Sequence, residues 1–577
     1  MGREVWVCDA AGELQRREIC GVEQVCALGL GCRMCQPGRP FCDGQEVRVC
    51  NDDGESSTLQ MECPASQVCT GGACQDACAV AASERSNVGC EYMVVDLDNE
   101  FANGGFGGTP AADEQFAIVL ANPSSVLAQA QVWQSNGRPN SPAETIIGTY
   151  MIPPNDLVQI NLPARNVDGS TAGSDEGPGT HLSNFAYRVT TNFPVVAYQF
   201  NPVVQSYSND ASLLIPVPAL DTHYRILGWP TANPIDPLLH SPTDGIPDRS
   251  FVTIVGTQPG TTVRVTVAHD TNAGTIQGGG TIAGASAGGV IEQVIGRYDV
   301  LNIETDGIPG DLTGTVVEAS APVAVFSGGE RGIAPIDTAG VSAPPGGVPD
   351  DWCCTEHLEE QVFPTTAWGK KFVVTRSPVR SGHGTWREPD LFRVMADKPN
   401  TEIVTNLPAP NDRFVLGSNE WRDIPMDRSF TLIASEAVSI QQILVSQGWL
   451  DGNEKPGHGG DPSMILYPPI EQYRDEYVFL APPTFETNYV VLAAPTGTMV
   501  LLDGGDINAS EFMSICEYED AGQIDGIPYT TVTCPISGGT HRVESSMPVG
   551  IFVYGYHNVG SYGYAGGSNL TQINPLI

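Results

Sequence analysis

One strand-like phrase recurs four times between residues 192 and 554 and limits the folds open to this chain. Equivalent positions in the four copies are 128, 115 and 111 residues apart. The copies read NFPVVAYQF (192–200), SAPVAVFSG (320–328), SEAVSIQQI (435–443) and SMPVGIFVY (546–554). A second phrase follows the first three copies and begins at Asp210, Glu356 and Asp461. Such regular spacing indicates modules built on one template.

The segments between these phrases alternate apolar and polar residues, as in TTVRVTV (261–267) and LFRVMA (391–396). Alternation is typical of strands with one buried face, and the 64 glycines and 45 prolines favour turns over helices. We therefore expect an all-β protein with about four tandem β-sandwich-like modules. Their expected bounds are 88–203, 204–330, 331–447 and 448–577. A β-propeller is the alternative, but its blades usually take about 40–50 residues, less than half of this period.

The first 90 residues contain twelve of the sixteen cysteines, in a spacing that repeats. EQVC ends at Cys26 and SQVC ends at Cys69, and the gaps around them agree. The pattern predicts a truncated Cys-rich repeat at 1–37 and a complete one at 38–80. Units this small need covalent cross-links or a bound metal ion to be stable. Disulfides are favoured over zinc because the Cys32–Cys35 spacing is not kept in the second unit and no histidine precedes His181.

Disulfide bonds in turn imply an oxidising compartment. Cys516 and Cys534 flank a hairpin-like segment and are expected to pair, whereas pairing within the repeats cannot be read from spacing. Cys353 or Cys354 could reach Cys90, with a bond between the two neighbours as the alternative. The cysteines expected in disulfides are Cys42, Cys50, Cys63, Cys69, Cys74, Cys78, Cys90, Cys353, Cys354, Cys516 and Cys534.

The repeat register also bears on the start of the chain. The second unit begins with Cys42, and the first would need its equivalent cysteine one position before Met1. Residues 1–30 lack the basic start and apolar middle of a signal peptide. We expect a fragment or a misassigned start, with a signal peptide upstream and a secreted or outer-surface location.

Charge and hydropathy exclude several classes of partner. The chain has 28 basic and 67 acidic residues and a net charge of −39. This charge repels phosphate backbones and anionic lipid, so nucleic acid is not an expected partner. No apolar run approaches the roughly 20 residues that span a bilayer, so a membrane-spanning protein is not expected.

Few residues suggest chemistry. Asp96, Asp98 and Glu100 begin like a calcium loop, but Phe101 stands where a sharp-turning Gly is required, so the choice is between a non-EF calcium site and an acidic turn. No cofactor is expected apart from calcium at such a site. Ser286 lies in a G-x-S-x-G pattern within a glycine-rich loop and lacks the expected strand–helix context. We therefore expect no enzyme and no catalytic residues.

The order of several words resembles the IgGFc-binding protein N-terminal domain family, in its bacterial, myxobacterial-type form with Cys-rich repeats. These words are GCEYMVVDLDN, FPVVAYQFNP, SNDASLLIPVPAL, CCTEHLEEQVFP and VGIFVYGY, and the similarity covers about 88–577. The resemblance implies an extracellular adhesive or binding module and supplies no catalytic residues. The family is named after a mucosal mammalian protein that binds the Fc part of IgG.

Together these features predict a non-catalytic, secreted or cell-surface protein that binds an extracellular ligand: a glycan, a glycoprotein or another copy of itself. A structural surface-layer spacer is the alternative, and a hydrolase hidden in the β scaffold is a weaker one. Aromatic faces stack on sugars and anchor interfaces, although tryptophans also fill cores and module junctions. The candidate contact residues are Trp229, Trp352, Trp368, Trp421 and Trp449.

Overall fold

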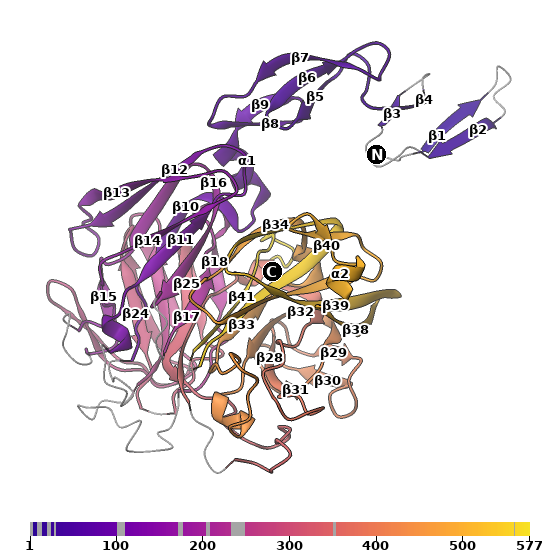
Figure 1. The fold of residues 1–577 in the computed structure, drawn as a ribbon. Coiled ribbons are helices and arrows are strands. Elements are labelled where there is room, and N and C mark those ends of the chain that lie inside the picture. The colour runs from indigo at the N-terminus through magenta and orange to yellow at the C-terminus, as the bar shows by residue number, and fades with distance from the viewer. Residues whose placement is uncertain are drawn as a thin grey trace. The chain divides into compact units, whose positions relative to one another are not determined.

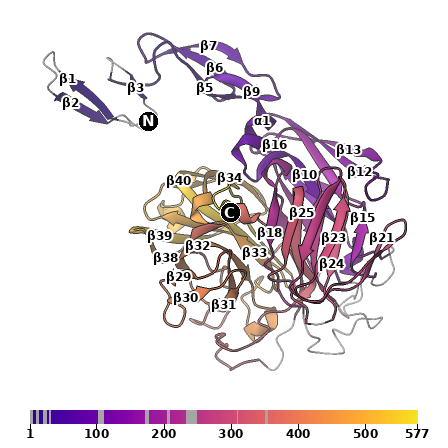
Figure 2. The same cartoon turned by 180° about the vertical axis from the view of Figure 1, so that it is seen from behind.

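The computed structural model divides the chain into two compact units, residues 1–83 with 192–194 and residues 84–191 with 195–577 (Figures 1 and 2). The structure describes residues 4–8, 14–19, 25–27, 31–100, 110–170, 177–203, 208–231, 248–307, 309–349, 354–558 and 560–576. Among these residues, no helix is both long enough and apolar enough to cross a membrane.

The first unit consists of short antiparallel strands, which pair in sequence order. The pairs are β1 (Glu4–Cys8) with β2 (Leu14–Ile19), β3 (Val25–Ala27) with β4 (Gly31–Arg33), and β8 (Gln67–Thr70) with β9 (Ala73–Asp76). A three-stranded sheet contains β5 (Pro40–Asp43), β6 (Glu46–Cys50) and β7 (Ser57–Glu62). Helix α1 (Ala77–Glu84) follows.

Disulfide bonds form the interior of this unit, as expected for so small a fold. Cys42 bonds to Cys69 and Cys63 to Cys74, and Val47 packs against Cys63 and Cys69. Apolar side chains alone cannot supply this core, so the sulfur bridges do.

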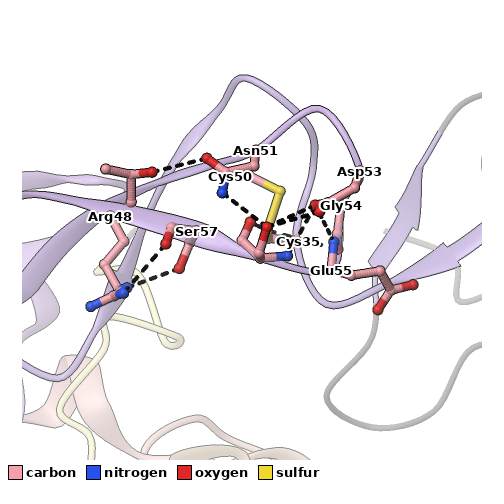
Figure 3. The surroundings of a disulfide bond; sticks show 10 residues. Cys35, Arg48, Cys50, Asn51, Asp53, Gly54, Glu55 and Ser57 are labelled. Atoms are coloured by element: carbon pink, nitrogen blue, oxygen red, sulfur yellow. Dashed lines mark hydrogen bonds between the residues drawn. A yellow bond between two sulfur atoms is a disulfide. The ribbon is translucent and has the colours of Figure 1, made fainter.

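A third bond joins Cys35 to Cys50 (Figure 3). It connects the last cysteine of the predicted repeat 1–37 to the second cysteine of the predicted repeat 38–80. Beside it, the Cys35 N–H donates to the Gly54 carbonyl at 3.2 Å. Successive repeats are thus linked covalently. Cys32, Cys78, Cys90 and Cys354 are also disulfide-bonded. The expected link from Cys90 to Cys353 or Cys354 stays a prediction, and Cys353 lies outside the described residues.

The second unit contains four antiparallel-rich sheets, here called modules 1 to 4, so the predicted all-β fold is confirmed. Module 1 contains β10 (Val88–Val94), β11 (Ala117–Ala121), β12 (Ala128–Ser135), β13 (Glu144–Ile152), β14 (Leu157–Asn161), β16 (Tyr187–Asn201) and β17 (Asp210–Leu213). Module 2 contains β15 (His181–Ser183), β18 (Asp221–Arg225), β19 (Ser250–Gly256), β20 (Thr261–Thr266), β21 (Gly274–Ile276), β22 (Thr281–Ile282), β23 (Val290–Ile295), β24 (Val300–Glu304), β25 (Val316–Gly332) and β26 (Glu356–Gln361).

Modules 3 and 4 follow the same order of strands. Module 3 contains β27 (Gly369–Val374), β28 (Asp390–Ala396), β29 (Thr401–Thr405), β30 (Arg413–Leu416), β31 (Trp421–Met426), β32 (Phe430–Ile443) and β33 (Met464–Tyr467). Module 4 contains β34 (Arg474–Ala481), β35 (Thr487–Pro495), β36 (Val500–Leu502), β37 (Gly505–Asp506), β38 (Glu517–Ile524), β39 (Ile527–Ile536), β40 (Gly539–Tyr556) and β41 (Ser561–Ala565), with helix α2 (Ser510–Met513). The 3-10 turns are η1 (Ala111–Asp113), η2 (Val217–Ala219), η3 (Thr365–Ala367), η4 (Gln447–Leu450) and η5 (Ile470–Gln472).

The recurring phrase is one long strand that takes part in two layers of its module. In β16, residues 187–191 pair with β12, whereas residues 196–200 pair with β11. The strands β25, β32 and β40 change partners in the same way. The change falls at Pro194, Pro322, Ala437 and Pro548. Proline suits the crossing because it has no N–H to leave unpaired.

The second recurring phrase forms or precedes the short strand that follows each of the first three long strands. β17 lies against β26 and β41, and β33 also lies against β26 and β41, so these four inner strands close a ring. Figure 1 shows β17, β33 and β41 near one another at the junction of the sheets. Strands β17, β26 and β33 belong to the sheets of modules 1, 2 and 3. These sheets therefore extend past the expected module ends at residues 203, 330 and 447. Whether the modules are separate domains stays a prediction, because all four share one compact unit.

The predicted bond between Cys516 and Cys534 is confirmed, and it ties the α2 segment to β39. Its removal by the double change Cys516→Ala and Cys534→Ala is expected to lower the free energy of unfolding by about 3 kcal/mol. The reason is the loop of 18 residues that the bond closes in the unfolded chain. Urea unfolding of both proteins, each with its other disulfides intact, measures the difference. Equal midpoints and slopes would contradict this.

Candidate functional site

Buried acidic residues gather where the inner strands meet. Five of them, Asp210, Glu356, Glu359, Glu360 and Asp461, are called the polar hub below. All five are at most 4% exposed. Ionised groups are rarely buried without partners, so their contacts decide what the hub does.

Asp210, the first residue of β17, connects three modules. Its Oδ2 accepts the backbone N–H groups of Glu359 and Met464, each at 3.2 Å. Its Oδ1 accepts the Ser463 hydroxyl at 2.9 Å. One side chain of module 1 therefore satisfies donors of modules 2 and 3.

Side chains of β26 likewise accept backbone N–H groups from the neighbouring modules 1 and 3. Glu356 accepts the N–H of Asn209, Glu360 accepts the N–H of Leu466 at 3.3 Å, and the Gln361 side-chain oxygen accepts the N–H of Ile215 at 2.7 Å. The ladders of the inner strands run within each module, so donors facing a neighbouring module need another acceptor. The segment TEHLEEQ (355–361) supplies these acceptors.

Burial shifts the protonation of the hub strongly. Burial and the nearby Glu359 raise the pKa of Asp210 well above its ordinary value, and burial raises the pKa of Glu359 to about 8. The pKa values of Glu356 and Glu360 are also raised well above the usual range, chiefly by burial. Burial lowers the pKa of the neighbouring His357 to about 3. The hub thus favours neutral forms of both acids and histidine.

The hub does not form a nucleophilic triad. The Ser212 hydroxyl donates to Glu359 at 2.7 Å, and Glu359 lies 3.3 Å from His357 Nε2. The carboxylate therefore stands between serine and histidine, whereas catalysis needs the histidine against the hydroxyl. Ser286 is exposed in a turn that leads into strand β23 rather than into a helix, so its G-x-S-x-G pattern lacks the required elbow.

The predicted calcium ligands separate in the structure. Among the described residues, the carboxylates close enough to share a cation are Asp98, Glu304 and Glu330, whose ligand oxygens lie within 4.8 Å of one another. Asp96 instead accepts the Arg165 N–H at 2.8 Å, and burial raises its pKa to about 7. Glu100 pairs with Arg331 Nε at 3.0 Å.

The cluster of Asp98, Glu304 and Glu330 joins modules 1 and 2. Glu304 is fully buried, accepts the Asn302 amide at 2.7 Å and lies 3.2 Å from the Arg249 guanidinium. The backbone N–H of Arg249 donates to the Glu330 carboxylate at 2.8 Å. Three carboxylates this close repel one another, and the Arg249 guanidinium, a shared proton or a bound cation can offset that repulsion. Hard oxygen donors of this kind are those that Ca²⁺ prefers.

Most of the candidate contact tryptophans lie inside the fold. Trp229, Trp368 and Trp449 are at most 4% exposed, so an outside ligand cannot touch them. The indole N–H of Trp229 donates to the Ile333 carbonyl at 2.8 Å, and that of Trp449 donates to the Ser342 carbonyl at 3.1 Å. They fill the interior because a large apolar surface gains most from burial there.

Trp421 is 38% exposed, and its ring faces the Arg393 guanidinium, 5.7 Å from the ring centroid. Arg393 also faces Trp229 and pairs with Asp311 and Asp423. Trp421 therefore belongs to a contact between modules 2 and 3, although one side remains accessible. Trp352 lies outside the described residues.

Sequence reasoning missed the roles of Glu304, Glu330 and the hub acids. A signal existed for the hub, because Asp210, Glu356 and Asp461 open the second recurring phrase. Nothing in the local sequence singles out Glu304 or Glu330.

Comparisons with known proteins identify a family. The family model described as IgGFc binding protein matches residues 210–555, from the first residue of β17 into β40. A human protein named IgGFc-binding protein is 23% identical over 442 residues, which is 76% of this chain and 7% of the human protein. Because the family match covers more than half of the sequence, the chain belongs to the IgGFc-binding protein family.

Proposed function

We propose that this chain is a secreted or cell-surface protein that binds an extracellular ligand without catalysis. The family match over residues 210–555 carries the proposal, because it spans nearly all of modules 2 to 4. The disulfide-rich first unit supports an oxidising location. The ligand classes in question are a glycan, a glycoprotein and a second copy of the chain.

A binding panel tests this proposal. The full chain is immobilised and exposed to an IgG Fc fragment, a mucin-type glycoprotein, a matrix protein and soluble full chain, with heat-unfolded chain as the control surface. Saturable binding of at least one probe to the folded chain alone is expected. Absence of all binding, both on this panel and on a glycan array, would overturn the proposal. Self-assembly into ordered layers without any other ligand would favour the structural spacer instead.

The hydrolase alternative is tested separately. A serine-reactive fluorophosphonate probe is expected to leave the folded chain unlabelled, because Ser286 sits in an exposed turn outside an elbow. Gel fluorescence measures the labelling, with Ser286→Ala as the matched variant. Labelling of the native chain that disappears in this variant would show an activated serine and contradict a non-catalytic role.

We also propose that calcium occupies the cluster of Asp98, Glu304 and Glu330. The single supporting observation is the convergence of three carboxylates within 4.8 Å. Calcium at about one hundred times its dissociation constant should stabilise the fold by about 2.7 kcal/mol. Denaturant unfolding in chelator and in calcium measures this difference.

Glu304→Gln is expected to abolish the calcium response, because it removes one of the three carboxylate ligands, and this ligand is fully buried. Glu511→Gln is the matched control, since Glu511 is exposed on α2. An unfolding transition that does not change between chelator and calcium would rule calcium out.

A further inference from the structure

A polar cavity opens on module 2, away from the hub. It lies where the edge strand β23 meets the β21–β22 hairpin and the turn between β12 and β13 of module 1. Its volume is about 550 Å³, and its wall includes Arg138, Asn140, Gln277 and Gln293 over Leu182 and Ile276. Sites for small molecules typically enclose about 300–1,000 Å³.

Gln293 is the most informative residue of this wall. Its neighbours on the same face of β23, Ile291 and Ile295, are buried in the core of module 2, and its ladder partner Val263 is fully buried. Alternation therefore calls for an apolar residue at position 293. The strand instead places a half-buried amide there, facing the cavity.

The Gln293 amide makes no hydrogen bond to another described residue. Two fully buried glutamines do make such bonds: Gln199 donates to Glu359 at 3.2 Å, and Gln472 donates to the Thr571 carbonyl at 2.7 Å. Buried polar groups normally find a partner in the protein or in ordered water. The donor and acceptor of Gln293 are thus available to a ligand in the cavity.

The surrounding groups are fixed by the fold while leaving polar atoms available. The Gln277 side-chain oxygen accepts the Asn184 N–H at 2.9 Å, which leaves its amide N–H₂ as a donor. Asn140 is held by its amide, which donates to the Val294 carbonyl at 2.7 Å. Arg138 makes no ion pair with a described residue. Its side chain passes beside Gly278, where a Cβ would lie 3.9 Å from Arg138 Cδ.

We propose that this cavity binds a short oligosaccharide. Vicinal hydroxyls both donate and accept hydrogen bonds, which matches the amides of Gln277 and Gln293 and the guanidinium of Arg138. The C–H faces of a sugar can pack on the apolar floor of Leu182 and Ile276. The net charge of −39 disfavours a phosphate-rich ligand. The proposal rests on the proposed function, the binding of an extracellular ligand, and names its class and its site.

The test uses the full chain on an array of neutral, N-acetylated and carboxylated oligosaccharides, followed by calorimetric titration with the best binder. Gln293→Leu restores the apolar pattern of β23 and is expected to weaken binding about tenfold or more while unfolding remains unchanged. Arg138→Ala is a second variant at an exposed position and should weaken binding several-fold. Gln523→Leu is the matched control, because Gln523 is an exposed strand residue of module 4.

The outcomes separate this inference from the proposed function. The cavity proposal is overturned if the array shows no binding, or if Gln293→Leu and Arg138→Ala both bind with the affinity of the native chain. If a protein probe binds in the earlier panel but no oligosaccharide binds on the array, the proposed function stands and this inference is refuted. An extended peptide that binds along β23, with its affinity lost in Gln293→Leu, would assign the cavity to peptides and also overturn the saccharide.

Discussion

Asp210→Ala is expected to lower the free energy of unfolding by about 3–5 kcal/mol, among the largest effects of any single change in this chain. The Asp210 carboxyl accepts the N–H groups of Glu359 and Met464 and the hydroxyl of Ser463. Alanine leaves these donors buried without an acceptor, and each loss costs about 1–3 kcal/mol. Guanidinium unfolding of the full chain, followed by tryptophan fluorescence, measures the change.

Asp210→Asn is the matched control. The amide keeps one acceptor oxygen and nearly the same volume, so a loss of about 1–2 kcal/mol is expected. If alanine and asparagine destabilise equally, the accepted hydrogen bonds are not the cause. If alanine leaves stability unchanged, Asp210 does not connect the modules energetically.

The module template could be predicted from the sequence because it depends on local pattern. Pro194, Pro322 and Pro548 mark the places where the long strands change layers, and their spacing gave the number of modules. The bond between Cys516 and Cys534 was equally predictable, since the two cysteines are only 18 positions apart. These features involve neighbours in sequence, and alternation and turn residues report on them directly.

Closure of the ring could not be predicted in the same way. Met464 donates to Asp210 across 254 residues, and Glu359 donates to it across 149. In sequence, EHLEEQ has a helical look and its acids are expected at the surface, because charged residues are seldom buried, whereas the structure makes it the buried strand β26. Only the tertiary arrangement shows that the carboxyls replace a missing ladder between modules.

The candidate site shows the same division. Asp98 was identified from an acidic cluster, but its partners Glu304 and Glu330 come from strands more than two hundred residues away. The covalent link from Cys35 to Cys50 crosses a repeat boundary, which spacing alone does not reveal. Tryptophan exposure depends on module contacts, so Trp229 and Trp421 could not be told apart in advance.

The folded chain is expected to become more stable as the pH falls from about 8 to about 6. Burial raises the pKa of Glu359 to about 8 and that of Asp461 to about 6, and it raises those of Asp210, Glu356 and Glu360 well above normal. In the unfolded chain these groups release their protons near pH 4. Between these limits the folded state binds more protons, so its stability is lost as the pH rises through the folded pKa values.

His357 acts in the opposite direction. Burial lowers its pKa to about 3, so below about pH 6.5 the unfolded state takes up a proton that the folded state refuses. This contribution to stability is lost as the pH falls. One histidine faces several carboxyls in and around the hub, so the carboxyls dominate, and stability is expected to go on rising as the pH falls toward about 5 rather than to peak near neutrality.

Chemical unfolding at fixed ionic strength, in half-unit steps from pH 5 to pH 8.5, measures this profile. Each net proton taken up by the folded state contributes about 1.4 kcal/mol per pH unit. Glu359→Gln keeps the acceptor for Ser212 but no longer titrates, so its profile should be flatter between pH 6 and 8. The exposed control Glu511→Gln should retain the native slope. Stability that stays level or rises toward pH 8.5 would mean that the hub carboxyls are ionised in the folded protein and would contradict this prediction.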